Sequence, residues 1–331
     1  MLSSKESSFL DLYGTIGEVD KRVNGSIPSF GEISSVGLSP RILNVLYRYS
    51  ISGGTRSEYV FKWSKALEKT GMILSTVGPE YMEKVVDARI LLIILISYID
   101  DIIDNRKQKD SLVRRTLVRR YDDRPDEDID LFVDEIWNNF YQIVRGLPLF
   151  DKYYPKFIID VERSINALFF TIENPLIREQ IGKDEFLDPF SYGMGVVSFL
   201  DIDLMASNDI DDTELRDIRD FMKICQKMAR ISNCLATWER EVDEGTYFSM
   251  PIFYALNEGI ISLEEIMNDE RASIKGKIQS SSIEYKLLRK WEEYLVRLYD
   301  YCDRIRSMDI HIFIKGIIIF LKMNLLHRGE L

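Results

Sequence analysis

Apolar residues recur at helical spacing along most of the chain, which is the pattern of amphipathic helices. This spacing predicts helices over the following ranges, in chain order: 58–70, 80–104, 131–144, 161–172, 213–241, 263–268, 282–308 and 311–326. No convincing run alternates apolar and polar residues as a half-buried strand does. No Gly-rich turn joins a strand to a helix, so Rossmann and P-loop architectures lack their structural context. The pattern therefore predicts an all-α fold.

The middle of the predicted helix over 80–104 is apolar nearly all round. A helix without a polar face belongs in the centre of a helical bundle. Its apolar run at 90–96 is too short to cross a bilayer, and two lysines and a glycine interrupt the run at 310–326. We therefore expect these segments to be buried helices, without stable membrane insertion.

The first 38 residues are mixed in character and contain five glycines. We interpret 1–38 as an irregular N-terminal arm. No repeat of 20–50 residues and no clear boundary follows. The sequence therefore predicts a single α-helical domain over 39–331, arranged as one helical bundle.

The net charge of −11 argues against nucleic acid as a partner, because phosphate binding needs a basic face. An anionic ligand would need a divalent cation to bridge it to this acidic chain. The three cysteines have no CxxC spacing, and the N-terminus lacks the apolar segment of a signal peptide. We expect reduced thiols and a cytoplasmic protein. The chain has two histidines, which argues against a His-based zinc site and against a Ser-His-Asp triad.

Three aspartates, Asp100, Asp101 and Asp104, stand at the end of the apolar helix. On a helix, Asp100 and Asp104 share one face at i, i+4, and Asp101 lies about 100° from Asp100. Acids in such a place are costly unless water or cations receive them. Their oxygens suit Mg²⁺, which also keeps open positions for phosphate oxygens.

A second polar group lies in the sequence ISNCLATWERE. Asn233, Thr237 and Glu241 stand at i, i+4 and i+8, so they form one stripe on one face of a helix. An amide oxygen, a hydroxyl and a carboxylate can together chelate one Mg²⁺. Two such faces on two helices could hold a diphosphate between them.

These two groups, with their spacing, resemble the DDxxD motif and the Asn/Asp–Ser/Thr–Glu motif of class I terpene synthases of microbial type. The resemblance continues through GTYFSMPIFYALNEGIISLEEIM and covers most of 60–328. Phe313, Gly316 and Phe320 resemble a C-terminal pattern that usually has Trp at the two aromatic places. Cys234 departs from the Asp that the family commonly has there.

The resemblance implies a helical bundle around a central active-site cavity, and an enzyme whose cofactor is Mg²⁺, three ions in the family's pattern. Its metal ligands would be Asp100, Asp101, Asp104, Asn233, Thr237 and Glu241. Its substrate would be a linear C15 or C20 prenyl diphosphate, which is ionised and cyclised with release of diphosphate. The family's usual diphosphate-sensing arginine is missing from DPFSYGMGVV, so the candidates for diphosphate binding are Arg178, Arg230 and Arg328. Candidates for the substrate pocket are Tyr98, Phe169, Phe170, Gly193, Phe199 and Phe320.

Two other functions stay open on the sequence. Chain-elongating isoprenyl diphosphate synthases are similar but usually carry two aspartate-rich motifs, whereas the second motif here is Asn/Thr/Glu. A non-catalytic helical scaffold would carry the same acidic residues on solvated faces. The resemblance also leaves a homodimer open, because many members of the family form dimers.

Overall fold

The computed structural model describes residues 28–106, 128–173, 182–208 and 210–328. Its first elements are α2 (Phe30–Ser34), α3 (Pro40–Ile51), α4 (Glu58–Leu67), the π-helical turn η1 (Glu68–Met72), η2 (Pro79–Tyr81), α5 (Met82–Arg106), α7 (Asp128–Val144) and α8 (Phe150–Glu173). There follow α9 (Lys183–Ser191), η4 (Tyr192–Met194), α10 (Val196–Met205), α11 (Leu215–Asp243), α12 (Met250–Asn257), α13 (Leu263–Met267), α14 (Arg271–Gln279), α15 (Ile283–Tyr299) and α16 (Ile310–Leu326). Within the described residues there are helices and no strands, which confirms the all-α prediction.

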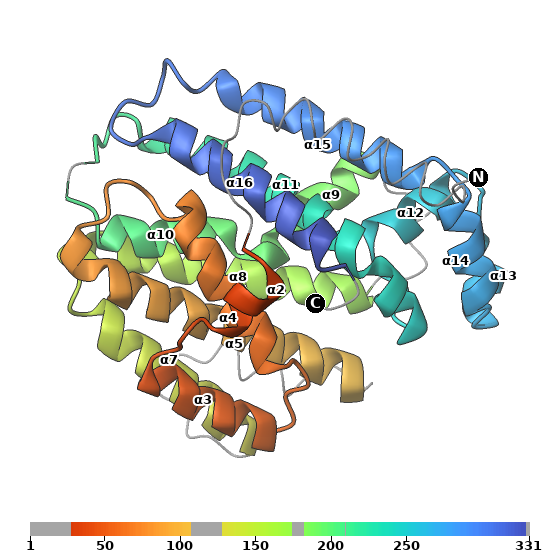
Figure 1. Ribbon diagram of the computed structural model, residues 1–331, viewed down its shortest axis with the longest axis horizontal. Helices are drawn as coiled ribbons and strands as arrows, with labels where there is room; N and C mark the ends of the chain where they lie inside the picture. The colour runs from red at the N-terminus through yellow and green to blue at the C-terminus, as the bar shows by residue number, and fades with distance from the viewer. Residues whose placement is uncertain (1–27, 107–127, 174–181, 209, 329–331) are drawn as a thin grey trace.

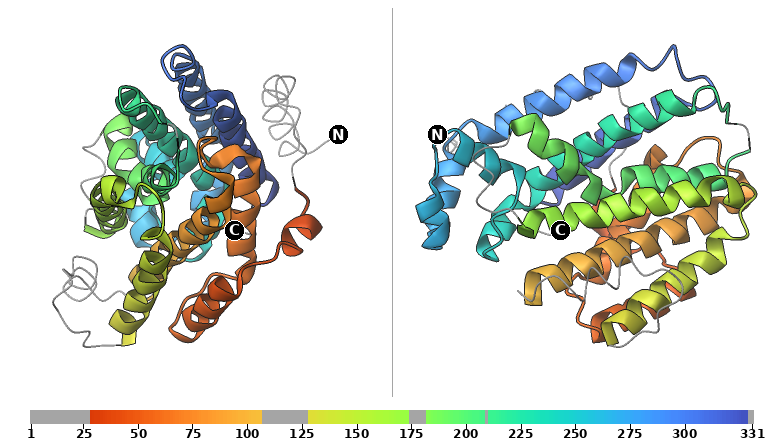
Figure 2. Two further views of the ribbon diagram at one scale, coloured as in Figure 1. Left: turned by 90° about the vertical axis from the view of Figure 1, so that its left-hand side faces the viewer. Right: turned by 180° about the vertical axis from the view of Figure 1, so that it is seen from behind.

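Two long helices, α5 and α11, organise the bundle. Helix α5 packs against α3, α4, α7, α8 and α10, and α11 packs against α9, α10, α12, α14, α15 and α16. The ribbon shows α15 and α16 along one side of the molecule and α3 and α7 along the opposite side (Figure 1). The view from behind shows the same order, with α13 and α14 at one end (Figure 2). Both long helices pack against α10, which joins their two sets of neighbours into one bundle.

Helix α5 is central because its sequence has no polar face along its middle. Ile90, Leu91, Ile94, Leu95 and Tyr98 are each at most 1% exposed. This burial confirms the prediction of a central helix and removes a large apolar area from water. No helix within the described ranges is long and apolar enough to cross a membrane.

The backbones of η1 and α16 touch, and glycines make this contact. Gly71 has φ +100°, and a Cβ there would lie 2.7 Å from the carbonyl oxygen of Ile312. A Cβ on Gly316 would lie 2.9 Å from the carbonyl carbon of Gly71. Only glycine combines such a φ with so close an approach. The contact brings Glu68, at the start of η1, against the interior of the bundle.

Some boundaries differ from the sequence prediction. Helix α8 begins at Phe150, well before the predicted residue 161, and continues through Pro155. Tyr153 and Phe157, on either side of this proline, are buried in the core, so packing outweighs the local cost of the proline. The stretch expected to be irregular contains α2, whose N-terminus is capped by Ser29 and Glu32.

Candidate active site

A cavity of about 290 Å³ lies between α4, α5, η4, α10, α11 and α16. One of its ends, which we call the motif end, is lined by Asp100 from α5 and by Asn233, Thr237 and Glu241 from α11. The i, i+4, i+8 spacing places the three α11 residues on the single face that looks into the cavity. The structure thus brings the two sequence motifs to one place.

The polar atoms at the motif end are poorly satisfied by the protein itself. The hydroxyl of Thr237 donates to Oε1 of Glu241 at 2.6 Å. Oε2 of Glu241 is buried and has no hydrogen-bond partner among the described residues. Burial raises the pKa of Glu241, and the negative charge of Asp100 raises it further. The two carboxylates therefore lie close enough to repel each other, and a cation between them would be favoured.

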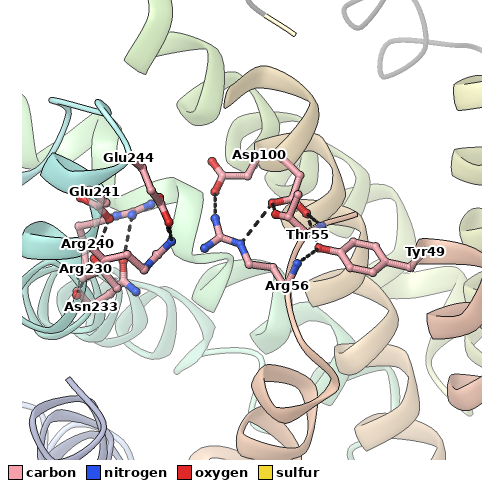
Figure 3. Close-up of polar contacts among 11 residues, drawn as sticks. Tyr49, Thr55, Arg56, Asp100, Arg230, Asn233, Arg240, Glu241 and Glu244 are labelled. Carbon is pink, nitrogen blue, oxygen red and sulfur yellow. Dashed lines mark hydrogen bonds and ion pairs between the residues drawn. The ribbon is translucent and has the colours of Figure 1, made fainter. Parts of the chain in front are cut away.

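Three arginines, Arg56, Arg230 and Arg240, also line the motif end. Arg56 pairs with Asp100 at 3.1 Å, and Nη1 of Arg240 donates to Glu244 at 2.9 Å. Burial raises the pKa of Asp100, whereas the positive charges of Arg56 and Arg230 lower it. Figure 3 shows Asp100 and Arg56 facing the α11 residues across the gap. Such a mixture of acids and guanidinium groups suits a ligand that carries both metal ions and anionic oxygens.

Arg230 is held by the break between α9 and α10. Its guanidinium carbon lies 4.1 Å from the centre of the Phe190 ring, and Nη1 reaches Asn233 at 3.4 Å. A Cβ on Gly193 would lie 2.5 Å from Nη2 of Arg230. The absence of a side chain at Gly193 is therefore what lets this arginine lie against η4.

The donors of the α11 stripe fit a divalent cation. Amide, hydroxyl and carboxylate oxygens are ligands for hard ions such as Mg²⁺, and Oε2 of Glu241 has an unused lone pair. Among the described side chains, no group of three or more acidic, histidine or cysteine residues is gathered to hold a metal. A cation here would accordingly need Asn233, Thr237 and oxygens of a ligand in addition to the carboxylates.

No protein-family model matches this sequence, and no curated protein matches it. Among solved structures, it is similar to the 2-methylisoborneol synthase from Streptomyces coelicolor A3(2), in complex with Mg²⁺ and 2-fluoroneryl diphosphate. That match has a TM-score of 0.51 and 12% identity, and covers 92% of this chain and 94% of that one. An α-eudesmol synthase matches with a TM-score of 0.47 and 13% identity, over 91% of this chain and 97% of that one.

This chain has the class I terpene synthase fold. The similarity extends over nearly the whole length of both chains, so the fold accounts for the complete helical bundle. At 12% identity it establishes the architecture alone.

Within this fold, the first motif divides between two environments. Asp101 is 2% exposed and does not line the cavity. Its carboxylate accepts hydrogen bonds from the Tyr49 hydroxyl and from both the backbone N–H and the hydroxyl of Thr55. Because it lies about 100° around α5 from Asp100, Asp101 connects α5 to the segment after α3. The side chain of Asp104 lies outside the described residues.

Some of the predicted pocket residues line the cavity and others do not. Gly193, Phe199 and Phe320 line the cavity. Tyr98 does not, because two helical positions separate it from Asp100 and turn it by about 200°. It packs against Phe132, with ring centres 4.7 Å apart.

Four further candidates lie away from the cavity or outside the described residues. Phe169 is buried in the core without lining the cavity. Phe170, as a side chain, and Arg178 lie outside the described residues. Arg328 does not line the cavity either, since it donates to Glu239 on another face of α11 and to Glu284 on α15.

Sequence reasoning missed two of the arginines at the motif end. Arg240 stands directly before Glu241, so the position of the second motif could have indicated it. Arg56 lies before α4 in a segment without periodicity, and no sequence signal pointed to it.

The opposite end of the cavity is closed by a second set of charges, which we call the floor cluster: Glu68, Arg89 and Asp203. Arg89 is 2% exposed and donates to Glu68 at 2.5 Å and to both oxygens of Asp203, at 3.0 and 2.5 Å. Glu68 and Arg89 line the cavity, whereas Asp203 lies behind them. The sequence analysis did not single out any of these three residues.

Proposed function

We propose that this chain is a Mg²⁺-dependent terpene synthase that ionises a linear C15 or C20 prenyl diphosphate and cyclises the resulting cation. One observation carries the proposal: Asp100 on α5 and Asn233, Thr237 and Glu241 on α11 line the same end of one cavity. The fold agrees with this proposal, and the solved 2-methylisoborneol synthase of that fold contains Mg²⁺ and a diphosphate analogue.

The motif end would bind the diphosphate. Asp100 and the α11 stripe would hold Mg²⁺, three ions if the family's pattern applies, and the bound metal would supply positive charge to the departing diphosphate. Arg230, with Arg56 and Arg240, would donate charge-assisted hydrogen bonds to the diphosphate oxygens. Arg56 pairs with Asp100 in the structure, so it would have to exchange that partner for the ligand.

The walls below the motif end would enclose the hydrocarbon chain. Ile93, Met194 and Phe199 line the cavity, and so do Trp63 and Phe320. The rings of Trp63 and Phe320 meet edge to face, with centres 5.7 Å apart. Aromatic faces attract cations, and apolar walls keep water from quenching a carbocation early. The cavity would therefore both fold the chain and protect the intermediate.

Product analysis with defined substrates tests this function. The purified protein is incubated with Mg²⁺ and separately with C10, C15 and C20 prenyl diphosphates, and a hexane extract is examined by gas chromatography–mass spectrometry. A cyclic terpene is expected, and Asp100→Asn and Asn233→Ala should each reduce it by about a hundredfold or more, because metal-bound charge stabilisation is worth several kcal/mol.

Asp220→Asn is the matched control, since Asp220 lies on the same helix, α11, but pairs with Lys223 at the surface. Its product yield should equal that of the unmodified protein. A longer prenyl diphosphate formed after addition of isopentenyl diphosphate, without cyclic product, would instead establish the chain-elongating alternative. Folded protein that forms neither product would favour a non-catalytic scaffold.

A further inference from the structure

The floor cluster lies far from the motif end along the same two helical segments. Eleven positions of α5 separate Arg89 from Asp100, which corresponds to about 16 Å of helix. The chain segment around α4 runs alongside in the opposite sense: Arg56, before α4, pairs with Asp100, and Glu68, after α4, pairs with Arg89. A prenyl chain anchored by its diphosphate at the motif end would therefore extend toward Glu68.

The charges of the floor cluster do not cancel. Two carboxylates share the one guanidinium of Arg89, so the fully ionised cluster has a net charge of −1. All three residues are at most 9% exposed. Burying an uncompensated negative charge is costly unless a cation can reach it. The cluster is placed where a positively charged reaction intermediate would supply that compensation.

The two carboxylates of the cluster are not equivalent. Asp203 accepts hydrogen bonds at both oxygens from Arg89, and its Oδ2 also accepts one from the backbone N–H of Leu74 at 2.8 Å. Within the described part of the chain, Arg89 alone donates to the carboxylate of Glu68, and it does so at Oε2. Glu68 also lines the cavity, and Asp203 does not. The acceptor that remains available to the cavity is therefore Oε1 of Glu68.

We propose that Glu68 is the base that ends the reaction, a role that rests on the terpene synthase function proposed above. A C–H bond on the carbon next to the cationic centre breaks, and its electron pair forms a C=C bond that neutralises the cation. The proton moves to Oε1 of Glu68, and it passes to solvent when the product leaves. The released product is accordingly an alkene.

Other features of the floor support this role. Burial raises the pKa of Glu68 to about 7, which makes its carboxylate a stronger proton acceptor than an exposed glutamate. The guanidinium of Arg89 lies 5.3 Å from the centre of the Phe199 ring, which also lines the cavity. Arg89 is thus held between an aromatic face and two acids, and it positions Glu68 without titrating itself.

The test separates ionisation from termination by measuring diphosphate release and the distribution of hydrocarbon products in the same reactions. Glu68→Gln is expected to lower the share of the main alkene by about tenfold or more, in favour of products with the double bond elsewhere, and to slow diphosphate release far less. Glu68→Asp withdraws the carboxylate by one methylene group and should shift the distribution in the same direction by a smaller factor.

The control is Asp201→Asn. Like Glu68, Asp201 is a buried acid paired with an arginine, here Arg219, but it lies on α10 and does not line the cavity. An unchanged distribution in both Glu68 variants would overturn the proposal, as would an equal shift in Asp201→Asn, or an unmodified enzyme whose main product is an alcohol formed from water. Absence of Mg²⁺-dependent diphosphate release from the unmodified protein would instead refute the underlying synthase function, and the role of Glu68 with it.

Discussion

The two ends of the cavity both carry acids and arginines, but they are organised differently. At the floor, Arg89 satisfies two buried carboxylates with short hydrogen bonds. At the motif end, Oε2 of Glu241 and Nε of Arg230 are buried and have no hydrogen-bond partner among the described residues. Arg89 anchors both floor carboxylates from within the protein and leaves Oε1 of Glu68 to the cavity, whereas the motif end has polar atoms that await a ligand. Stability should therefore depend mainly on the floor, and ionisation of the substrate on the motif end.

The largest effect on stability is expected from Arg89→Met. This change leaves Glu68 and Asp203 buried without their cation, and breaking a buried ion pair in this way costs about 3–5 kcal/mol. The free energy of unfolding in urea measures the loss. Arg304→Met is the matched control: Arg304 pairs with Asp217 but is 53% exposed, so its loss should cost less than about 1 kcal/mol. Equal losses of unfolding free energy in the two variants would show that the buried floor cluster contributes no more than a surface ion pair.

The floor should also make stability depend on pH. The folded-state pKa of Glu68 is raised to about 7 from 4.5, so the folded protein binds more protons than the unfolded chain between these values. The contribution of Glu68 to stability is therefore fully present below about pH 4.5 and is lost as the pH rises toward 7, by up to about 3 kcal/mol. Glu68→Gln should flatten this part of the curve of unfolding free energy against pH. Equal slopes in both proteins would show that Glu68 does not titrate there.

At the motif end we expect a substitution to reduce activity without reducing stability. Glu241→Gln removes a proposed metal ligand, so product formation should fall by about a hundredfold or more. It also removes a buried charge that folding must desolvate, so the free energy of unfolding should stay the same or rise by about 1 kcal/mol. A strongly destabilised Glu241→Gln protein would mean that the carboxylate of Glu241, like those of the floor, is anchored by contacts within the protein.

The smallest effect is expected from Gly193→Ala. The new methyl group would meet Nη2 of Arg230 at 2.5 Å and a side-chain carbon of Leu168 at 3.3 Å, so the guanidinium must shift. A misplaced diphosphate donor should lower kcat/KM by about tenfold. Gly276→Ala, on α14, meets nothing within 4 Å and should leave activity unchanged while adding up to about 1 kcal/mol of stability. A normal rate in Gly193→Ala would argue against Arg230 as a diphosphate ligand.

The sequence predicted those features that depend on periodicity. The apolar run of α5 indicated a central helix, and the four-residue spacing of Asn233, Thr237 and Glu241 indicated one polar face. Both follow from the geometry of a single helix, which is the same in any fold. The same geometry, applied to Tyr98, would have turned it away from the cavity that contains Asp100.

Only the tertiary structure decided which residues meet across the cavity. Arg56 joins Asp100 from a segment without periodicity, and the partners of Arg89 come from positions 21 and 114 residues away. It also separated Asp100, in the cavity, from Asp101, which binds Tyr49 and Thr55. Local spacing determines the direction in which a side chain leaves its own helix. The packing of α4, α5, α10 and α11 determines what that side chain then contacts, and no local pattern encodes it.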